Sequence, residues 1–416
     1  MRITTCCCCG SNDLVHLPMI SESGLANNLE EFGNSVRNHK LYPLALSCCN
    51  TCTHIQLTDP VDPSHLFSDY SYKSGVSRSF QEHFSEYAKT VSALIPGKDR
   101  KVLDIGFNDA CLLDSFHSLG WATYGVDPAV NLVKIAQETK KHVVTAAYFG
   151  DQKVFDGLTF NAITANNVFA HTRSINGFLR SVKDKLEKNG SFVFEVQYLP
   201  DMLGRSLFDM IYHEHTSYHH LTPLVKCTES NGLSIYHVER IGTHGGSIRV
   251  YAKHSENTSL PINNSVADLI EYERSIFGDS PVAKVLGLLQ HIKDIAVDSA
   301  MLLEKLKGKG QTVVGYTAPA KATTFMSCLP KHASDSISFV VDDSPLKQGR
   351  YIPGTDIVIS DDGKLIELAE EIGPSNISVI IFAWNIASSV KETLVQKLPQ
   401  LASSNFYTLL PTAEAC

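Results

Sequence analysis

The densest group of chemically capable side chains lies at residues 212–220, which read YHEHTSYHH. This segment holds four histidines, two tyrosines and a glutamate. One interpretation is a zinc site, although the order HEH differs from H-E-x-x-H, which places two histidines on one helix face. Another is acid/base catalysis, in which an imidazole takes a proton, a carboxylate orients it and a phenol donates to developing negative charge. A solvated polar loop is the third, and these residues alone leave the choice open.

Cysteines form a second chemical group, because seven of the 11 lie before residue 53. Cys6 with Cys9 and Cys49 with Cys52 give two C-x-x-C pairs, a spacing at which four thiolates reach one tetrahedral zinc. Such a site is structural, since four sulfurs leave no open position. The alternative is a run of reactive or disordered cysteines. The spacing assigns no role to Cys7, Cys8 and Cys48.

Residues 101–128 predict a ligand site on a parallel sheet. An apolar run carrying Asp104 breaks at Gly106, a helical pattern follows, and a second short strand ends at Asp127. In such a unit the ligand lies at the carboxyl edge of the strands, where the final acid can bind a ribose diol. The turn lacks G-x-G-x-x-G, and Asp109 stands where a pyrophosphate would sit. A carboxylate there suits a cationic ligand such as S-adenosylmethionine; the alternative is an α/β domain that binds no nucleotide.

Strands and helices alternate through most of the chain, which predicts an α/β fold with two sheets. Residues 238–253 alternate around THGGS, which predicts a glycine-turned hairpin. Further strands are expected at residues 142–148, 160–165, 191–196, 312–316, 337–342 and 379–384. Helices are expected at residues 79–94, 175–186 and, as a connector, 256–306.

Several polar residues fall at predicted strand ends or loops. His171 follows a strand and is expected at the catalytic edge, with a core histidine as the alternative. The hairpin turn is expected to bring His244 and Arg249 near a substrate. Tyr70 and Tyr72 lie in a connector and are read as loop tyrosines or as phenols that reach the site.

Size and charge bound the function. A chain of 416 residues is too long for one core and suggests two or three domains. A net charge of -8 and a pI near 6.1 argue against a nucleic-acid surface. The amino terminus lacks the apolar region of a signal peptide and no stretch is long enough to cross a bilayer, so a cytoplasmic protein without a membrane partner is expected.

Taken together, these motifs resemble the sugar C-methyltransferases of deoxysugar biosynthesis, a three-domain family that includes enzymes of the mycarose and tetronitrose pathways. The resemblance covers nearly the whole chain. The motifs that carry it are the cysteine pairs, NVFAH at 167–171, YHEH at 212–215, HGGS at 244–247, GYTAPAKATT at 315–324 and DDSPLKQGRYIPGT at 342–355. It implies a zinc module and connector at 1–75, a Rossmann-like S-adenosylmethionine methyltransferase domain at 76–254, and a second Rossmann-like domain at 255–416 that helps to bind a nucleotide sugar.

The resemblance also implies roles for single residues. His215 is expected to be the general base, with Tyr212, Glu214 and His171 as its active-site companions. One of Tyr70 or Tyr72 matches a family tyrosine, and the sequence leaves open which. The residues expected to contact the cofactor are Asp104, Gly106, Asn108, Asp109, Asp127, Pro128, Asn166 and Asn167. The residues expected to contact the substrate are Tyr70, Tyr72, His244, Lys321, Lys347 and Arg350, the last three as partners of a diphosphate.

The chain departs from the family pattern at Phe107 and Ala110, where relatives carry a small residue or Cys and then Gly, and a bulkier turn is expected to alter cofactor contacts. The implied reaction is methyl transfer from S-adenosylmethionine to a ring carbon of a dTDP- or GDP-linked 4-keto-6-deoxysugar, with C3 expected and the choice between C3 and C5 left open. The ketone acidifies the neighbouring C–H, so a base can form an enolate that attacks the methyl group. Methylation at a sugar oxygen, or a zinc-containing scaffold that only binds nucleotide sugars, are the alternatives.

Overall fold

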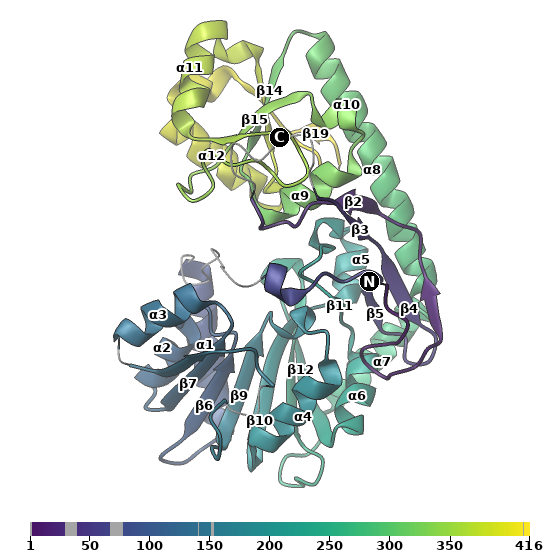
Figure 1. Ribbon diagram of the computed structural model, residues 1–416, viewed down its shortest axis with the longest axis vertical. Helices are drawn as coiled ribbons and strands as arrows, with labels where there is room; N and C mark the ends of the chain where they lie inside the picture. Colours follow the sequence, from purple (N-terminus) through teal and green to yellow (C-terminus); the bar gives the residue numbers. More distant parts are fainter. Residues whose placement is uncertain (1, 30–39, 67–77, 140, 151–153, 411) are drawn as a thin grey trace.

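The computed structural model describes all residues except 1, 30–39, 67–77, 140, 151–153 and 411. The chain forms a small N-terminal module, a central α/β domain and a C-terminal α/β domain, as the sequence predicts (Figure 1). The long helix α8 (Val282–Gly308) runs from the central domain to the C-terminal one, and the N-terminal module lies beside their junction. Within the described part of the chain, no helix combines the length and apolar character needed to cross a membrane.

The central domain is built on a seven-stranded sheet in the order β12-β13-β10-β9-β6-β7-β8. Six of these strands run in the same direction, and β13 runs antiparallel to its neighbours β10 and β12. The chain order reverses between β6 and β9, so their carboxyl ends form the switch point where a ligand binds. The strands are β6 (Lys101–Ile105), β7 (Ala122–Asp127), β8 (Val143–Ala146), β9 (Phe160–Asn166), β10 (Leu186–Gln197), β12 (Leu233–Ile241) and β13 (Ser247–His254).

Successive side chains of β6 enter opposite cores, which makes the sheet doubly covered. Val102 packs with Phe84 of α1 (Arg78–Leu94) and Phe116 of α2 (Cys111–Ser118). Leu103, the next residue, packs in the core that contains Leu179 of α4 (Ile175–Lys185). Neighbouring residues of a strand point to opposite faces, and that alternation accounts for the two layers. The other helices of this domain are α3 (Val130–Thr139), α5 (Leu199–Gly204), α6 (Leu221–Ser230) and α7 (Asn264–Phe277).

The N-terminal module shares a sheet with the central domain. Its strands β1 (Leu14–His16), β4 (Leu46–Cys49) and β5 (Ile55–Leu57) are joined by β11 (Ser217–Tyr218), which closely follows YHEH. A separate hairpin of β2 (Ser21–Ser23) and β3 (Tyr42–Leu44) packs on α9 (Ala320–Cys328) of the C-terminal domain. The module therefore contacts both larger domains.

The C-terminal domain repeats the α/β plan with a six-stranded sheet in the order β16-β15-β14-β17-β18-β19, parallel except for β19. The strand expected at 379–384 ends at Ile381, because a short turn of helix begins at Trp384. The strands are β14 (Thr312–Tyr316), β15 (Ile337–Val341), β16 (Ile359–Ser360), β17 (Ile377–Ile381), β18 (Asn405–Thr408) and β19 (Glu414–Ala415). The remaining helices are α10 (Lys331–Ser334), α11 (Asp362–Ile372) and α12 (Ala387–Lys397).

Candidate active site and zinc centre

The four cysteines of the two C-x-x-C pairs come together as predicted, with their sulfur atoms within 4.8 Å of one another. The Sγ atoms of Cys6 and Cys52 are 3.6 Å apart, and those of Cys9 and Cys49 are also 3.6 Å apart. Hydrogen bonding from the Cys6 thiol, followed by that from Cys8, lowers the pKa of Cys52 to about 6. Four thiolates at this separation fit a tetrahedral zinc ion.

Two of the cysteines that the spacing left unassigned, Cys7 and Cys8, contact the central domain. The Cys7 sulfur lies 3.5 Å from the hydroxyl of Ser217, and the Cys8 thiol donates to the Pro223 carbonyl. The carbonyl of Cys8 in turn accepts hydrogen bonds from the Asn176 amide and the Cys227 thiol. Cys48 is fully buried in β4.

The turn after β6 is shaped by residues in the left-handed region. Gly106 has φ 68°, and a Cβ placed there would lie 2.4 Å from Cγ2 of Val168. Ala110 has φ 65°, a conformation that suits the glycine of relatives better than alanine. Phe107 is buried among core residues and touches Gly125, so its bulk fills the core beneath the turn. The expectation that the bulkier turn alters cofactor contacts stays a prediction.

Acids at two strand ends organise the predicted cofactor site. Asp127 accepts hydrogen bonds from the backbone amides of Asn108, at 3.0 Å, and Ala129, at 2.8 Å, and burial raises its pKa. Asp104 accepts from the Thr164 hydroxyl at 2.7 Å, and burial raises its pKa to about 7. The two carboxylates thus lie at the ends of neighbouring parallel strands.

Asn166, at the end of β9, supplies an unsatisfied amide at the same edge. Among the described residues, neither its oxygen nor its nitrogen has a hydrogen-bond partner. Asn167 follows with φ 56°, and its backbone amide donates to the Glu195 carbonyl. Asp109 and Pro128 lie in the adjoining turns. A cavity of about 530 Å³ opens between the end of β8 and the start of α4. The turn at Gly106, the unsatisfied side-chain amide of Asn166 and the carboxylates at the ends of β6 and β7 together fit S-adenosylmethionine.

The YHEH loop places His215 as a neutral base. Its Nδ1 donates to the carbonyl of Met210 at 2.9 Å, so Nε2 carries the lone pair. The Tyr212 hydroxyl lies 3.1 Å from that Nε2, and the His171 ring is centred 5.0 Å away. Burial, and secondarily the neighbouring His171, lower the pKa of His215 well below its usual value. His215 is therefore unprotonated, and able to accept a proton, at neutral pH.

The other predicted members of the loop face different ways. His171 Nδ1 donates to the backbone carbonyl of Glu214 at 2.7 Å, and burial lowers the pKa of His171. The Glu214 carboxylate instead accepts from the side-chain amide of Asn27 at 2.5 Å. His213 Nε2 donates to the Pro43 carbonyl. Among the described residues only the four cysteines group as metal ligands, so the zinc interpretation of YHEH finds no counterpart there.

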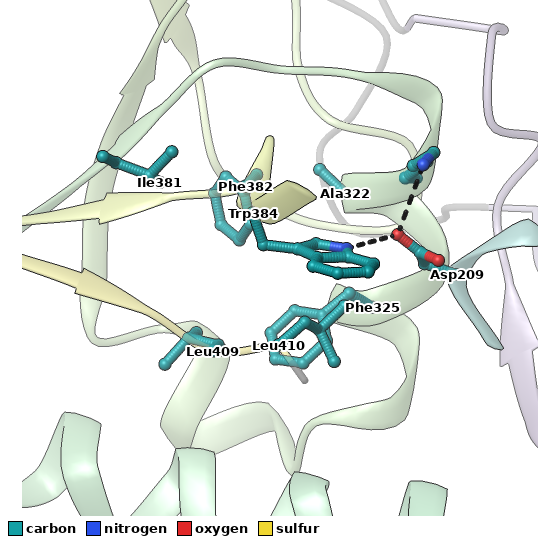
Figure 2. Close-up of a pocket in the computed structure, with 9 residues that line it drawn as sticks. Asp209, Ala322, Phe325, Ile381, Phe382, Trp384, Leu409 and Leu410 are labelled. Atoms are coloured by element: carbon teal, nitrogen blue, oxygen red, sulfur yellow. Dashed lines mark hydrogen bonds and ion pairs between the residues drawn. The ribbon is translucent and has the colours of Figure 1, made fainter. Parts of the chain in front are cut away.

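A buried carboxylate joins this loop to the C-terminal domain. Figure 2 shows Asp209 facing the indole of Trp384, with Phe325 and Leu410 beside the ring. The Asp209 Oδ2 accepts from Trp384 Nε1 at 2.8 Å and lies 3.8 Å from the Lys321 ammonium.

His244 in the hairpin turn belongs to the same junction. Burial, together with the positive charge of Lys321, lowers the pKa of His244 to about 4. His244 also contributes to the lowered pKa of His215. The structure thus brings His244, Lys321 and His215 into one electrostatic neighbourhood.

The remaining predicted substrate contacts are less closely grouped. Lys347 binds the Asp342 carboxylate and the Ala318 carbonyl, each at 2.9 Å, and so anchors its own loop. Arg350 is half-buried in the same loop. Arg249 is buried against Glu195, with Nη2 to Oε1 at 2.7 Å, and its expected place near a substrate stays a prediction. Tyr70 and Tyr72 lie outside the described residues.

Sequence reasoning missed the roles of Asn27, Asp209 and Trp384. Each is an ordinary polar or aromatic residue outside any motif, and each acquires a role only through a contact with a distant segment. Asp209 shortly precedes the dense YHEH segment, and that proximity was the one available signal.

Three domain families match the chain in succession. A domain family described as zinc binding matches residues 6–67, a methyltransferase domain family matches residues 80–238, and the C-methyltransferase C-terminal domain family matches residues 242–411. The C-methyltransferase NovU of Streptomyces niveus is 29% identical over 365 residues, 86% of this chain and 85% of that protein. The mitochondrial ubiquinone biosynthesis O-methyltransferase of Bos taurus is 29% identical over 193 residues, 41% of this chain and 52% of that protein.

Solved methyltransferase structures overlap part of the chain. An S-adenosylmethionine-dependent methyltransferase from Clostridium acetobutylicum shares 13% identity, covering 42% of this chain and 92% of its own, with a TM-score of 0.36. A magnesium protoporphyrin IX methyltransferase from Synechocystis shares 16% identity, covering 42% and 83%, with a TM-score of 0.35. The family matches, the relation to NovU and the four-cysteine centre agree with one another. The chain is therefore an S-adenosylmethionine-dependent methyltransferase with a zinc-binding module, and it is similar to C-methyltransferases in its C-terminal domain and in its relation to NovU.

Proposed function

We propose that the chain methylates a ring carbon, C3, of a nucleotide-linked 4-keto-6-deoxysugar. The observation that carries the proposal is the tautomer of His215: with Nδ1 donating to the Met210 carbonyl, Nε2 of this buried side chain is a neutral acceptor. A carbon next to a ketone is acidic enough for such a base, whereas a saturated sugar carbon is no nucleophile. S-adenosylmethionine supplies the electrophilic methyl group.

Tyr212 would act on the enolate oxygen, whereas His171, whose Nδ1 proton is donated to the Glu214 carbonyl, would need a second proton on Nε2 to do so. When His215 accepts the substrate proton, the Tyr212 hydroxyl must leave Nε2 and is then available to the oxygen that gains charge. One positioned donor of this kind is worth about 3 kcal/mol of transition-state stabilisation, and a matched base contributes roughly a hundredfold or more in rate. Lys321 and His244 are proposed to meet the diphosphate, and Asp104, Asp127 and Asn166 to hold the cofactor.

The experiment is exchange of the sugar α-proton with solvent deuterium in the absence of cofactor. The wild-type protein is expected to exchange the C3 proton of a 4-keto-6-deoxysugar nucleotide, because enolate formation does not need the methyl donor. His215→Ala is expected to bind S-adenosylmethionine normally and to lose both exchange and turnover. Tyr212→Phe is expected to lower turnover by about 10²–10³-fold.

Different results would point elsewhere. A sugar O-methyltransferase transfers the methyl group without exchanging the carbon-bound proton. A His215→Ala variant that is folded but no longer binds the cofactor would make His215 a structural residue. A panel of dTDP- and GDP-linked keto sugars, with NMR of the product, identifies the nucleotide and the methylated carbon.

A further inference from the structure

The loop that carries His215 is held on its outer side by the N-terminal module. His213 Nε2 donates to the Pro43 carbonyl at 3.2 Å, and its ring is centred 5.8 Å from that of Tyr42. Further along the loop, the Leu57 amide donates to the Thr216 carbonyl at 3.0 Å. The pairing of β11 with β5 follows at once. The module thus fixes the backbone on both sides of the catalytic position.

Asn27 makes the contact that comes nearest to the catalytic groups. Its side-chain amide donates to Glu214 Oε1 at 2.5 Å, and the Glu214 side chain is buried. The backbone carbonyl of the same Glu214 accepts from His171 Nδ1 at 2.7 Å. Glu214 therefore connects Asn27 to His171, whose ring lies opposite that of His215.

The turn that carries Asn27 is itself clamped by the C-terminal domain. A Cβ placed on Gly24 would lie 2.6 Å from Cβ of Pro353, so the two segments are in close contact. The Thr323 hydroxyl of α9 lies 3.5 Å from the Ala26 carbonyl. Within the turn, the Asn28 amide donates to the Leu25 carbonyl at 3.0 Å. Asn27 thus stands where all three domains meet.

We propose that Asn27 is a positioning residue for the methyl transfer. Its amide fixes the Glu214 carboxylate, and the backbone of Glu214 then fixes the ring of His171 opposite His215. The kinetic part of this inference rests on the proposed function, whereas the orientation of the two imidazoles does not. The Asn27 amide donates to a carboxylate that is buried at the edge of the loop, and each hydrogen bond that a buried charge accepts stabilises it.

Two substitutions separate positioning from simple packing. Asn27→Ala removes the donor and is expected to lower kcat about tenfold, with the KM for sugar nucleotide within about twofold. Asn27→Asp places a second carboxyl against Glu214, and two carboxylates in contact share one proton. The ratio of the Asn27→Asp kcat to the wild-type kcat is therefore expected to rise as the pH falls and the aspartate gains a proton that it can donate to Glu214. The corresponding ratio for Asn27→Ala is expected not to change with pH.

Asn28→Ala is the matched control, because Asn28 is exposed in the same turn and its side chain makes no hydrogen bond among the described residues. It is expected to leave kcat unchanged. Nitrogen-15 spectra of the histidines give a readout without substrate: Asn27→Ala should disturb the His171 signals, and Asn28→Ala should not.

A folded Asn27→Ala variant with wild-type kcat and unchanged His171 signals would overturn the inference. The inference would also be overturned if kcat relative to the wild type did not change with pH for either Asn27→Ala or Asn27→Asp. If the wild type transfers no methyl group to any keto sugar nucleotide, the proposed function fails, and the histidine spectra still decide whether Asn27 orients His171.

Discussion

Replacing Gly106 by alanine tests the architecture of the cofactor turn. The residue has φ 68°, and an L-amino acid pays roughly 1–2 kcal/mol in that conformation. The added methyl would lie 2.4 Å from Cγ2 of Val168, and overpacking of this kind costs about 1–3 kcal/mol. Gly106→Ala is therefore expected to lower the free energy of unfolding by about 2–5 kcal/mol. Because Val168 follows Asn166 and Asn167, the affinity for S-adenosylmethionine should fall as well.

A second substitution separates the two contributions. Val168→Ala removes the clash and leaves the backbone strain, so the double variant should recover about 1–3 kcal/mol relative to the sum of the single variants. Urea unfolding gives the stabilities, and calorimetry gives the cofactor affinity. A Gly106→Ala variant whose stability lies within about 0.5 kcal/mol of wild type, with unchanged cofactor affinity, would refute this reasoning.

Two further predictions concern the metal and pH. Cys49→Ser is expected to lose the bound zinc and to unfold at a lower temperature than the wild type. Cys48→Ser changes a buried thiol outside the four proposed ligands and is expected to keep the metal. Metal analysis and thermal unfolding of the two variants test this prediction. Because burial raises the pKa of Asp104 from 3.8 to about 7, the folded state binds a proton that the unfolded state releases, and stability is lost as the pH rises from about 4 to 7. Asp104→Asn should therefore gain about 3 kcal/mol relative to wild type between pH 5 and pH 8 in urea unfolding, and an equal pH dependence of the two proteins would contradict the assignment.

Local sequence patterns predicted those features that depend on neighbours along the chain. The alternation within residues 238–253 predicted the hairpin of β12 and β13. The spacing of Cys6 with Cys9 and of Cys49 with Cys52 predicted the four-cysteine cluster. The order of apolar run, glycine and helical pattern likewise predicted β6, the turn at Gly106 and α2. Each of these signals lies within one or two segments, and the physical rule connecting it to structure is local.

The contacts that local patterns missed are those between domains. Asn27 and Glu214 are separated by 187 residues, and Asp209 and Trp384 by 175. Nothing about an asparagine in a polar segment reveals that its amide will face a particular carboxylate, because its partner is chosen by the packing of whole domains. Phe107 shows the same limit on a smaller scale, because its size alone did not reveal that its ring packs in the core beneath the turn.

The buried carboxylate of Asp209 couples the C-terminal domain to the segment that precedes His215. Its Oδ2 is matched by the Trp384 indole and the Lys321 ammonium, both from the C-terminal domain. Without that domain a carboxylate that is 1% exposed would lose these partners, and its segment would have to rearrange to reach water. The next residue is Met210, whose carbonyl fixes the tautomer of His215. Displacing Asp209 would therefore displace the carbonyl that fixes the tautomer of His215, so domain packing and the proposed proton transfer depend on the same short segment.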